Sequence, residues 1–207
     1  MADAAEKAGL VAMVNLTYRN VAPLQAAREM VLAGKIGKVR HLEASYLQSW
    51  LVSKAWGDWM TESKWLWRLS TKHGSNGVLG DVGIHILDFA SYGAGSDVER
   101  IFTRLKTFDK YEGNKIGVYD LDANDSFTMT AELENGAMGV IHASRWATGH
   151  LTNFACASTA TRVLWKSSTH LTIPACGPAS AKTWRRLSGK PSRWSRWRRT
   201  TKNSPRQ

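Results

Sequence analysis

Residues 123–147, ANDSFTMTAELENGAMGVIHASRWA, decide the fold class of this 207-residue chain. Apolar and polar residues alternate on both sides of Asn135-Gly136, which is the pattern of two half-buried β-strands. An Asn-Gly pair can supply the two positive-φ residues of a tight type I′ turn. The stretch therefore predicts an antiparallel hairpin, and with it a sheet whose one face packs on a core.

The residues on the N-terminal side of this hairpin alternate between strand and helix patterns. An apolar run rich in Val and Leu predicts a buried strand, and apolar residues at helical spacing predict helices. We expect strands at 9–18, 39–49 and 98–108, and helices at 77–92 and at 24–34, the latter opened by Pro23 and ended by Gly34. This order predicts an α+β domain up to about residue 154.

Composition excludes several classes of protein. The hydrophobic content of 43% supports a packed core, and no run approaches the roughly 20 apolar residues that a membrane helix needs. Asp3 and Glu6 stand where a secretory signal carries only positive charge. Both cysteines, Cys156 and Cys176, lie in the last quarter of the chain, which suits a reducing compartment. We therefore expect a cytoplasmic protein without a membrane segment.

The net charge of +11 comes from the C-terminal part of the chain. Residues 155–207 hold twelve of the 28 Lys and Arg and none of the 17 Asp and Glu, so the remainder is close to neutral. Basic residues so confined argue against nucleic-acid binding by the main body. The remaining hypothesis of that kind is a tail whose arginines bind phosphates and whose tryptophans stack on bases.

The helix predicted over 77–92 carries the candidate chemistry. Asp81, His85 and Asp88 are spaced i, i+4 and i+7 and therefore share one helix face. An Asp one turn before a His can accept its ring N–H, which suits a general acid–base group. Three interpretations stay open at this point: a structural hydrogen-bonded cluster, a catalytic site, or a divalent-metal site that would need His73 or His142.

Two further patterns near this helix also have two interpretations each. Glycines recur every third residue at Gly74, Gly77, Gly80 and Gly83, which allows either close packing of the helix or close approach of a ligand. Five tryptophans within residues 50–67 form either a core or dimer contact, or an aromatic platform for the apolar face of a sugar. In the second case Lys54, Asp58 and Arg68 would contact the sugar hydroxyls.

Several of these stretches together resemble one family. GVLGDVGIHILDFA (77–90) is similar to the G-G-x-x-x-D-x-G-x-H-x-x-D signature of Gfo/Idh/MocA oxidoreductases, the family of glucose–fructose oxidoreductases and inositol dehydrogenases. The resemblance extends over residues 15–50, 65–70 and 123–150 and covers roughly residues 9–154. It implies an open, mixed, mostly antiparallel sheet with helices on one face, preceded by a Rossmann domain that binds NAD or NADP.

The resemblance also implies roles for individual residues. His85 would take the proton from a substrate hydroxyl, and Asp81 would orient it or bind substrate. Substrate-binding roles fall to Arg68, Trp67, Lys54 and Asp88, and cofactor-binding roles to Tyr18 and Arg19. No metal is implied. The partners would be a sugar or polyol substrate and further copies of the chain, which would associate through the open face of the sheet.

The chain departs from the family pattern in its first residues. The Gly-rich phosphate loop, the ribose-binding acid and the E-K-P lysine have no counterpart, and without that loop no helix N-terminus is available for a pyrophosphate. We expect residues 1–36 to be a remnant strand and helix of the Rossmann domain, and 37–154 to be the substrate and oligomerisation domain. The expectation is a fragment of an NAD(P)-dependent oxidoreductase that is inactive alone.

Residues 155–207 follow a different pattern, without acids and without an amphipathic period. Read one base out of phase, Cys156–Ser167 is compatible with Arg-Val-Tyr-Gly-Asp-Lys-Gly-Ala-Leu-Glu-Val, which resembles the family at this place. This predicts a shift of the reading frame near residues 152–155, a tail that is disordered, and a sheet edge left exposed and prone to association. The alternatives to an enzyme fragment are a non-catalytic oligomerisation or binding module, polyanion binding through the tail, and an independent metal enzyme.

Overall fold

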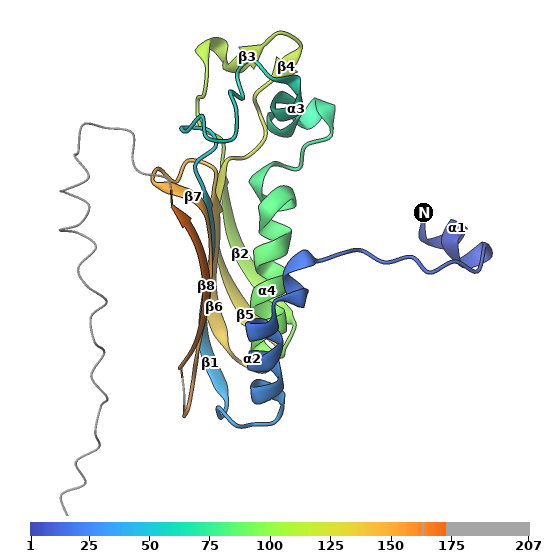
Figure 1. Ribbon diagram of the computed structural model, residues 1–207, viewed down its shortest axis with the longest axis vertical. Helices are drawn as coiled ribbons and strands as arrows, with labels where there is room; N and C mark the ends of the chain where they lie inside the picture. Colours follow the sequence, from blue (N-terminus) through green and yellow to red (C-terminus); the bar gives the residue numbers. More distant parts are fainter. Residues whose placement is uncertain (163, 173–207) are drawn as a thin grey trace, which may run out of the picture. The chain divides into compact units, whose positions relative to one another are not determined.

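The computed structural model describes residues 1–162 and 164–172 (Figure 1). Segments with strand periodicity form a six-stranded sheet, and two segments with helical periodicity form helices that pack on it. In chain order the elements are α1 (Ala2–Lys7), η1 (Thr17–Asn20), α2 (Ala22–Leu32), β1 (Val39–Gln48), α3 (Ser63–Leu66), η2 (Trp67–Leu69), η3 (Thr71–His73), η4 (Leu79–Gly83), α4 (Ile84–Ala94), β2 (Val98–Lys106), η5 (Glu112–Asn114), β3 (Lys115–Ile116), β4 (Tyr119–Asp120), β5 (Ser126–Leu133), β6 (Met138–Ser144), β7 (His150–Ala160) and β8 (Leu164–Thr172).

The sheet has the order β2-β5-β6-β1-β7-β8 and is mixed, as the family resemblance implies. Its central pair, β1 and β6, is parallel, with Leu42 opposite Gly139 and Tyr46 opposite Ala143. The other neighbours are antiparallel. Because β1 and β6 run in the same direction, their carboxyl ends meet at one end of the sheet, and the candidate site lies there.

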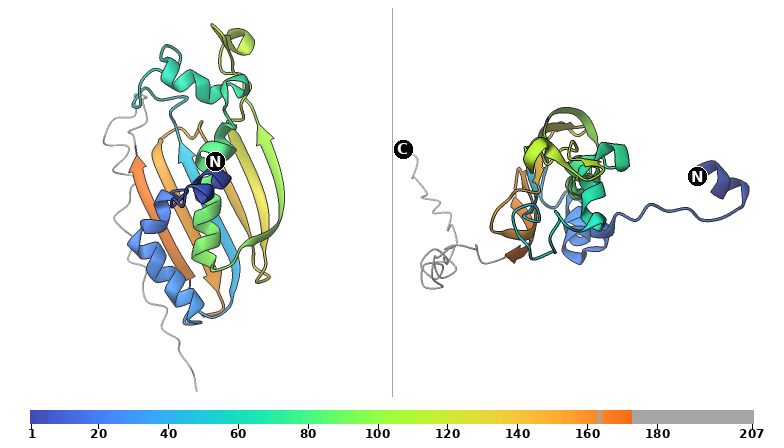
Figure 2. Two further views of the ribbon diagram at one scale, coloured as in Figure 1. Left: turned by 90° about the vertical axis from the view of Figure 1, so that its right-hand side faces the viewer. Right: turned by 90° about the horizontal axis from the view of Figure 1, so that it is seen from above.

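Helices α2 and α4 cover one face of the sheet (Figures 1 and 2). Burial alternates along β5, where Phe127, Met129, Ala131 and Leu133 point to the helices. Gly83 lies where the helix is nearest the sheet, because a Cβ there would stand 2.9 Å from the Phe127 ring. Within the described part of the chain, Gly77 and Gly80 are likewise crowded, by Asn124 and Asn76. For these glycines the structure favours the packing interpretation.

The predicted hairpin is present, but its turn is of another type. Gly136 has φ +78°, whereas Asn135 keeps a negative φ. The Gly136 N–H donates to the Leu133 carbonyl (2.8 Å), and the Leu133 N–H donates to the Ala137 carbonyl (2.8 Å). This is a type I turn followed by a left-handed glycine, the second common way of closing a hairpin. The predicted type I′ turn is wrong because a three-residue connection needs only one positive φ.

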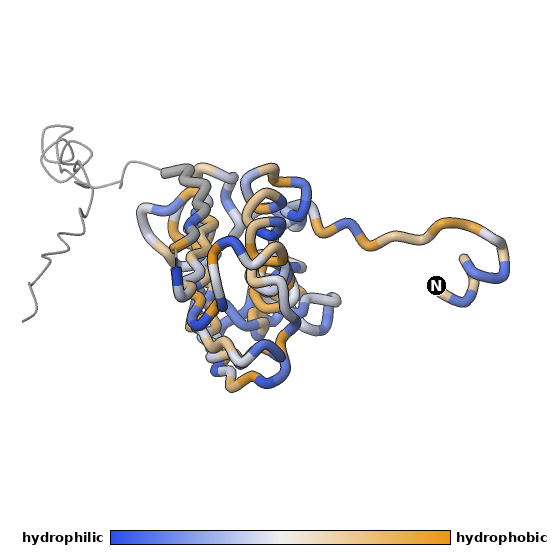
Figure 3. The backbone as a smooth tube through the Cα atoms, turned by 90° about the horizontal axis from the view of Figure 1, so that it is seen from below, coloured by the Kyte–Doolittle hydropathy of each residue, from blue (hydrophilic) through white to orange (hydrophobic). Residues whose placement is uncertain are grey.

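Residues 9–18 do not form the predicted buried strand. Gly9–Leu16 has no regular structure, and Thr17–Asn20 is the short helix η1. The apolar side chains Leu10, Val11, Met13 and Val14 are 69–98% exposed, and the segment carries them along an extended path (Figure 3). A strand needs a neighbouring strand for its backbone hydrogen bonds, and none lies beside this segment within the described residues.

Leu24 and Ile36, at 0% and 2% exposure, belong to the main core together with Val39 and Leu42, so residues 22–36 pack with the sheet. The division of the chain at residue 36 stays a prediction. Residues 155–160 continue β7 and 164–172 form β8, so the disordered tail was wrong for these residues. Alternation explains β7, since Phe154, Cys156 and Ser158 are buried.

The rest of the tail, residues 173–207, lies outside the described residues, and with it the arginines and tryptophans of the nucleic-acid hypothesis. Within the described residues no helix is both long and apolar enough to cross a membrane.

A second, smaller core caps the end of the sheet where β1 and β6 finish. It is built around Trp50, Leu51, Trp59, Leu66, Leu69 and Leu121. The Trp59 indole N–H donates to the Leu51 carbonyl (3.1 Å), which satisfies its polar atom in this apolar surrounding. This aromatic cap stands beside the first turn of the η4–α4 helix and closes one side of a cavity.

Candidate functional site

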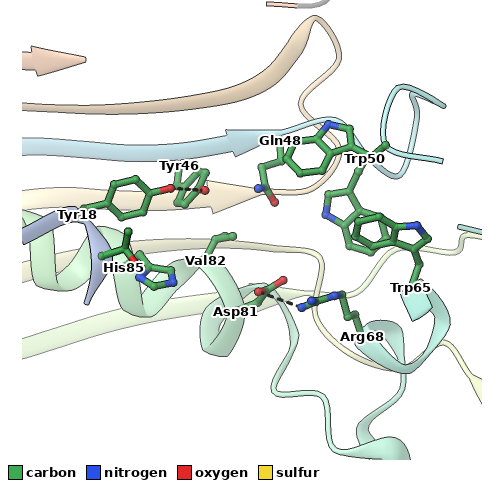
Figure 4. A pocket seen from close by; sticks show the side chains of 11 residues that line it. Tyr18, Tyr46, Gln48, Trp50, Trp65, Arg68, Asp81, Val82 and His85 are labelled. Atoms are coloured by element: carbon green, nitrogen blue, oxygen red, sulfur yellow. Dashed lines mark hydrogen bonds and ion pairs between the residues drawn. The ribbon is translucent and has the colours of Figure 1, made fainter. Parts of the chain in front are cut away.

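A cavity of about 360 Å³ opens between the carboxyl end of β1, the η4–α4 helix and the aromatic cap (Figure 4). Most of its walls are aromatic or aliphatic, and a few polar groups converge on it, which is the usual composition of a small-molecule site. The lining residues are Thr17, Tyr18, Tyr46, Gln48, Trp50, Trp56, Trp65, Arg68, Asp81, Val82 and His85.

His85 is in this cavity, on the first turn of α4. Its Nδ1 is buried and makes no hydrogen bond, and the Tyr18 ring meets its ring edge-on at 5.5 Å between centroids. The expected hydrogen bond from the imidazole to Asp81 is not formed, because the Asp81 carboxylate is turned toward Arg68 (Figure 4) and toward Arg145. His85 therefore has the position of an acid–base group without the partner that the sequence suggested.

Asp81 is held by Arg145 and Arg68. Arg145 Nη2 donates to Asp81 Oδ2 (2.9 Å), and Arg68 Nη1 stands 3.4 Å from Oδ1. Arg145 is fully buried and also donates to the Arg68 carbonyl (3.1 Å). Burial lowers the pKa of Arg145 and the neighbouring Asp81 opposes that shift, but a guanidinium stays protonated in proteins. Asp81 is thus fixed in place as a carboxylate facing the cavity.

Tyr18 and Tyr46 form the wall next to His85. Their hydroxyls are hydrogen-bonded at 2.8 Å, and the Tyr18 ring stacks on Phe154 at 4.3 Å. Burial, and then the hydrogen bond with Tyr18, raise the pKa of Tyr46 far above its usual value. The Tyr46 phenol therefore stays a neutral hydrogen-bonding group at physiological pH. Tyr18, predicted to bind cofactor, lies in this cavity beside the candidate acid–base residue.

The tryptophans divide between the two predicted roles. Trp59 and Trp50 are core residues, 6% and 4% exposed. Trp50 also lines the cavity, together with the half-buried Trp56 and Trp65. The Trp50 and Trp65 rings lie 5.6 Å apart with a tilt of 31°, so they present an aromatic surface beside Asp81 and Arg68 (Figure 4). An aromatic surface next to charged hydrogen-bonding groups suits a ligand with one apolar face and several hydroxyls.

Four predicted site residues lie outside this cavity. Arg19 forms a two-pronged ion pair with Asp88, with Arg19 Nε 3.0 Å from each carboxylate oxygen. Lys54 pairs with Asp58 at 2.8 Å on the surface. Trp67 lines a neighbouring cavity of about 220 Å³ instead. The Arg19–Asp88 pair therefore joins η1 to α4. Of the three residues predicted to share one helix face, Asp88 is in this structural pair, and Asp81 and His85 line the cavity.

Sequence reasoning missed Tyr46, Gln48 and Arg145. The signal that was available is the parity of the strands. Leu42 and Ala44 point to the core, so Tyr46 and Gln48 must do so too, and Ile141 and Ala143 likewise place Arg145 inward. Polar side chains that continue the buried side of two strands, at the ends that a parallel pairing brings together, mark a site.

The described residues offer no place for a metal or a dinucleotide. No three His, Cys, Asp or Glu side chains among them gather as ligands, so the metal-enzyme hypothesis gains no support. Of the two helices on the sheet, α2 follows η1 and not a strand. At the start of the other, the Val78 and Leu79 N–H groups donate to Asn124 (2.8 and 3.1 Å). They are therefore not free to bind a pyrophosphate.

Comparison with known proteins agrees with this fold. Levoglucosan dehydrogenase from Pseudarthrobacter phenanthrenivorans is 28% identical over 165 residues, which are 72% of this chain and 40% of that protein. The crystal structure of an oxidoreductase domain protein from Kribbella flavida matches with a TM-score of 0.64 and 28% identity, over 86% of this chain and 52% of that one. A levoglucosan dehydrogenase complex with NADH matches the fold with a TM-score of 0.62 at 24% identity, over 82% and 48%.

These relatives are about twice as long as the chain, which spans 40% to about half of their length. A family model described as the GFO/IDH/MocA C-terminal domain matches residues 24–162, including the η4–α4 helix and the strands β1 to β7. That match covers two thirds of the chain and contains every residue of the cavity except Thr17 and Tyr18. The chain therefore belongs to the GFO/IDH/MocA family, through its C-terminal domain.

Proposed function

We propose that residues 17–172 form the substrate half of an NAD(P)-dependent oxidoreductase that acts on a hydroxyl group of a sugar or polyol. The proposal is carried by one observation: His85 lies in a cavity whose other walls are an aromatic surface and a fixed carboxylate. The names of relatives support the substrate class, since one is a levoglucosan dehydrogenase with a structure in complex with NADH and levoglucosan.

In this proposal the described residues bind the substrate and accept the proton of its reacting hydroxyl. The sugar lies with its apolar face on Trp50 and Trp65, and its hydroxyls meet Asp81 and Gln48. His85 accepts the proton of the reacting hydroxyl, a role that suits an imidazole near neutral pH. NAD(P), when bound, would supply the hydride acceptor. It would be held by residues other than those described, because these do not fit a dinucleotide.

Two measurements test the proposal on the full chain. Sugars and polyols should quench tryptophan fluorescence with saturation, because three tryptophans line the cavity. The chain alone should not reduce NAD or NADP with any of them. If it did, and if His85→Asn abolished the reaction, the substrate-half proposal would be wrong and the chain would be a complete enzyme. If no sugar or polyol bound, the substrate class would be wrong.

We also propose association of two copies through the open face of the sheet. That face carries the exposed apolar side chains Phe102 (69%) on β2 and Met138 (53%) and Val140 (40%) on β6, with β5 between these two strands. Exposed apolar groups gathered on one sheet face are typical of an interface. The non-catalytic oligomerisation module remains the alternative function, and it predicts the same association without sugar binding.

A further inference from the structure

The charges at the inner end of the cavity do not cancel. Asp81 is the only acidic residue that lines either the 360 Å³ cavity or the neighbouring 220 Å³ cavity within the described structure. Two cations, Arg68 and Arg145, stand against it. The nearby buried pair of Lys110 and Asp125, 2.7 Å apart, is neutral as a unit. The cluster of Arg68, Arg145 and Asp81 therefore carries one surplus positive charge. Arg145 is fully buried, whereas the side chains of Arg68 and Asp81 are 34% and 32% exposed, so solvent screens this charge only in part.

The surplus belongs to Arg68 and not to Arg145. Arg145 has the shorter contact with Asp81 (2.9 Å against 3.4 Å) and a second acceptor in the Arg68 carbonyl. Arg68 has only the longer contact, whereas the Nε of both arginines is buried without a hydrogen-bond partner. A guanidinium has five N–H donors, and a buried donor without an acceptor is costly.

Arg68 is nevertheless held firmly. Its guanidinium carbon lies 4.7 Å from the centre of the Trp67 ring and 5.9 Å from that of Trp65. The side chain is 34% exposed, and it lines both cavities, so its remaining donors are accessible to a ligand. A planar fork of donors, stacked on aromatic rings and only partly paired, is the arrangement that binds a carboxylate with two parallel hydrogen bonds.

We propose that the substrate is a polyhydroxylated acid, a sugar or polyol that carries one carboxylate, and that Arg68 binds this carboxylate. The inference rests on the proposed function above and narrows its substrate class. A single negative charge neutralises the cluster. A phosphate, with nearly two charges at neutral pH, would exceed the surplus.

The placement of the two groups restricts the acid further. Asp81 and His85 lie one helical turn apart, with about 5–6 Å between their Cβ atoms, and Arg68 stands beyond Asp81 on the side of the aromatic cap. A ligand that offers a hydroxyl to His85 and a carboxylate to Arg68 must therefore carry them several carbons apart. A 2-hydroxy acid is too short, whereas an open-chain aldonate or a uronate has the required length.

Binding of gluconate and sorbitol to the full chain tests this, since the two probes differ in one terminal group, a carboxylate against a hydroxymethyl. We expect gluconate to bind at least tenfold more tightly at low salt, with the preference falling as salt is added. Arg68→Gln should bring the ratio of the two affinities near one, and Arg68→Lys should leave it intermediate. Lys72→Gln, which removes an exposed charge outside both cavities, is the matched control and should keep the preference.

Each result decides between the two proposals. Equal binding of both probes, or an Arg68→Gln protein that keeps the preference, overturns the carboxylate site but leaves the polyol site standing. Tighter binding of glucose 6-phosphate than of glucuronate also overturns it, in favour of a phosphate ligand. If neither gluconate nor sorbitol binds, both proposals fail. If Arg68→Gln does not fold, the salt dependence of the wild-type preference decides, and a preference independent of salt contradicts the inference.

Discussion

Arg145 is the residue that gives the site its fixed geometry. It comes from the end of β6, contacts Asp81 on the helix, and lies over the Trp50 ring at 5.1 Å. One fully buried side chain thus links the sheet, the helix and the aromatic cap. A buried ion pair adds little net stability over an apolar pair, but it is costly to break on one side only. Its value here is that it positions a carboxylate.

Arg145→Met should lower the free energy of unfolding by about 3 kcal/mol, because Asp81 loses its closest cation and the Arg68 carbonyl loses its donor. Urea denaturation followed by circular dichroism measures this. Lys35→Met, at an exposed position after α2, is the control and should change stability by less than about 0.5 kcal/mol. Equal stability of the two variants would mean that Arg145 does not hold the site together.

Asp122 is another polar residue that stabilises the fold, and its contribution to the free energy of unfolding depends on pH. It accepts hydrogen bonds from the Thr71 N–H (2.8 Å) and the Thr71 hydroxyl (2.6 Å). Partial burial works to raise its pKa, but the bonds from Thr71 outweigh this and leave it below the usual value. A carboxyl with a lowered folded-state pKa stabilises the native state above its unfolded pKa and loses that effect as pH falls through the folded value.

Asp122→Asn should therefore be less stable than wild type by about 1 kcal/mol at pH 7, and the difference should shrink as the pH is lowered below about 4. Thermal melts between pH 3 and pH 7 give both numbers. Asp97→Asn, at an exposed position, should show no such trend. A gap that widens toward acid pH would contradict the assignment of the stabilising form to the carboxylate.

At the scale of elements, the periodicity of apolar residues correctly predicted the helices and strands that depend on local sequence. The strands at 39–49 and 98–108, the helix at 24–34 and the hairpin follow from alternation and helical spacing, and all are present. The strand at 9–18 could not be judged in this way, because an apolar run does not tell whether a neighbouring strand exists. The spacing of Asp81 and His85 placed them on one helix face, and only the family resemblance implied roles in a site. Arg145, which holds Asp81, follows a distant strand, and spacing along one helix cannot reveal it.

The extension of β7 beyond residue 154 has a direct chemical test. Cys156 is 1% exposed and pairs with Ala44 across the sheet. Its burial raises the pKa of the thiol to about 12, although a hydrogen bond with Ser158 opposes the shift. In a Cys176→Ser background, the Cys156 thiol should resist iodoacetamide at pH 8 and react only after urea is added, because the thiolate is the nucleophile.

The reading-frame prediction bears on the same residue. Rapid alkylation of Cys156 without denaturant would mean that residues 155–160 do not belong to the sheet, as expected for a sequence read out of phase. Resequencing of the gene tests the frame shift itself, which stays a prediction.

At the scale of the whole molecule, the sheet has a covered face and an open one. The covered face carries the core, and the open face carries the apolar residues Phe102, Met138 and Val140. His142 follows Val140 on the same side of β6, opposite Thr128. Burial on this face lowers the pKa of His142, with Glu43 opposing the shift. An imidazole that stays neutral suits a surface that is to be covered.

Val140→Glu should convert a dimer into a monomer, because it would bury a carboxylate without a partner in the apolar interface. Sedimentation velocity measures the change. Met30→Glu, at an exposed position of α2 on the helical side, is the matched control and should leave the dimer intact. A wild-type chain that sediments as a monomer at micromolar concentration would contradict the interface.

The parallel pair at the centre of the sheet has a consequence for how ligand binding is detected. β1 supplies Tyr46 and Gln48 to the cavity wall, and Arg145, which follows its distant partner strand β6, holds Asp81 in place, so a chain in which these two strands have not paired lacks a complete binding site. A ligand of this cavity therefore binds the fully folded chain and no folding intermediate in which these strands are unpaired. Its whole binding free energy adds to the free energy of unfolding. A shift of the melting temperature is accordingly the most sensitive screen for the natural ligand of this protein.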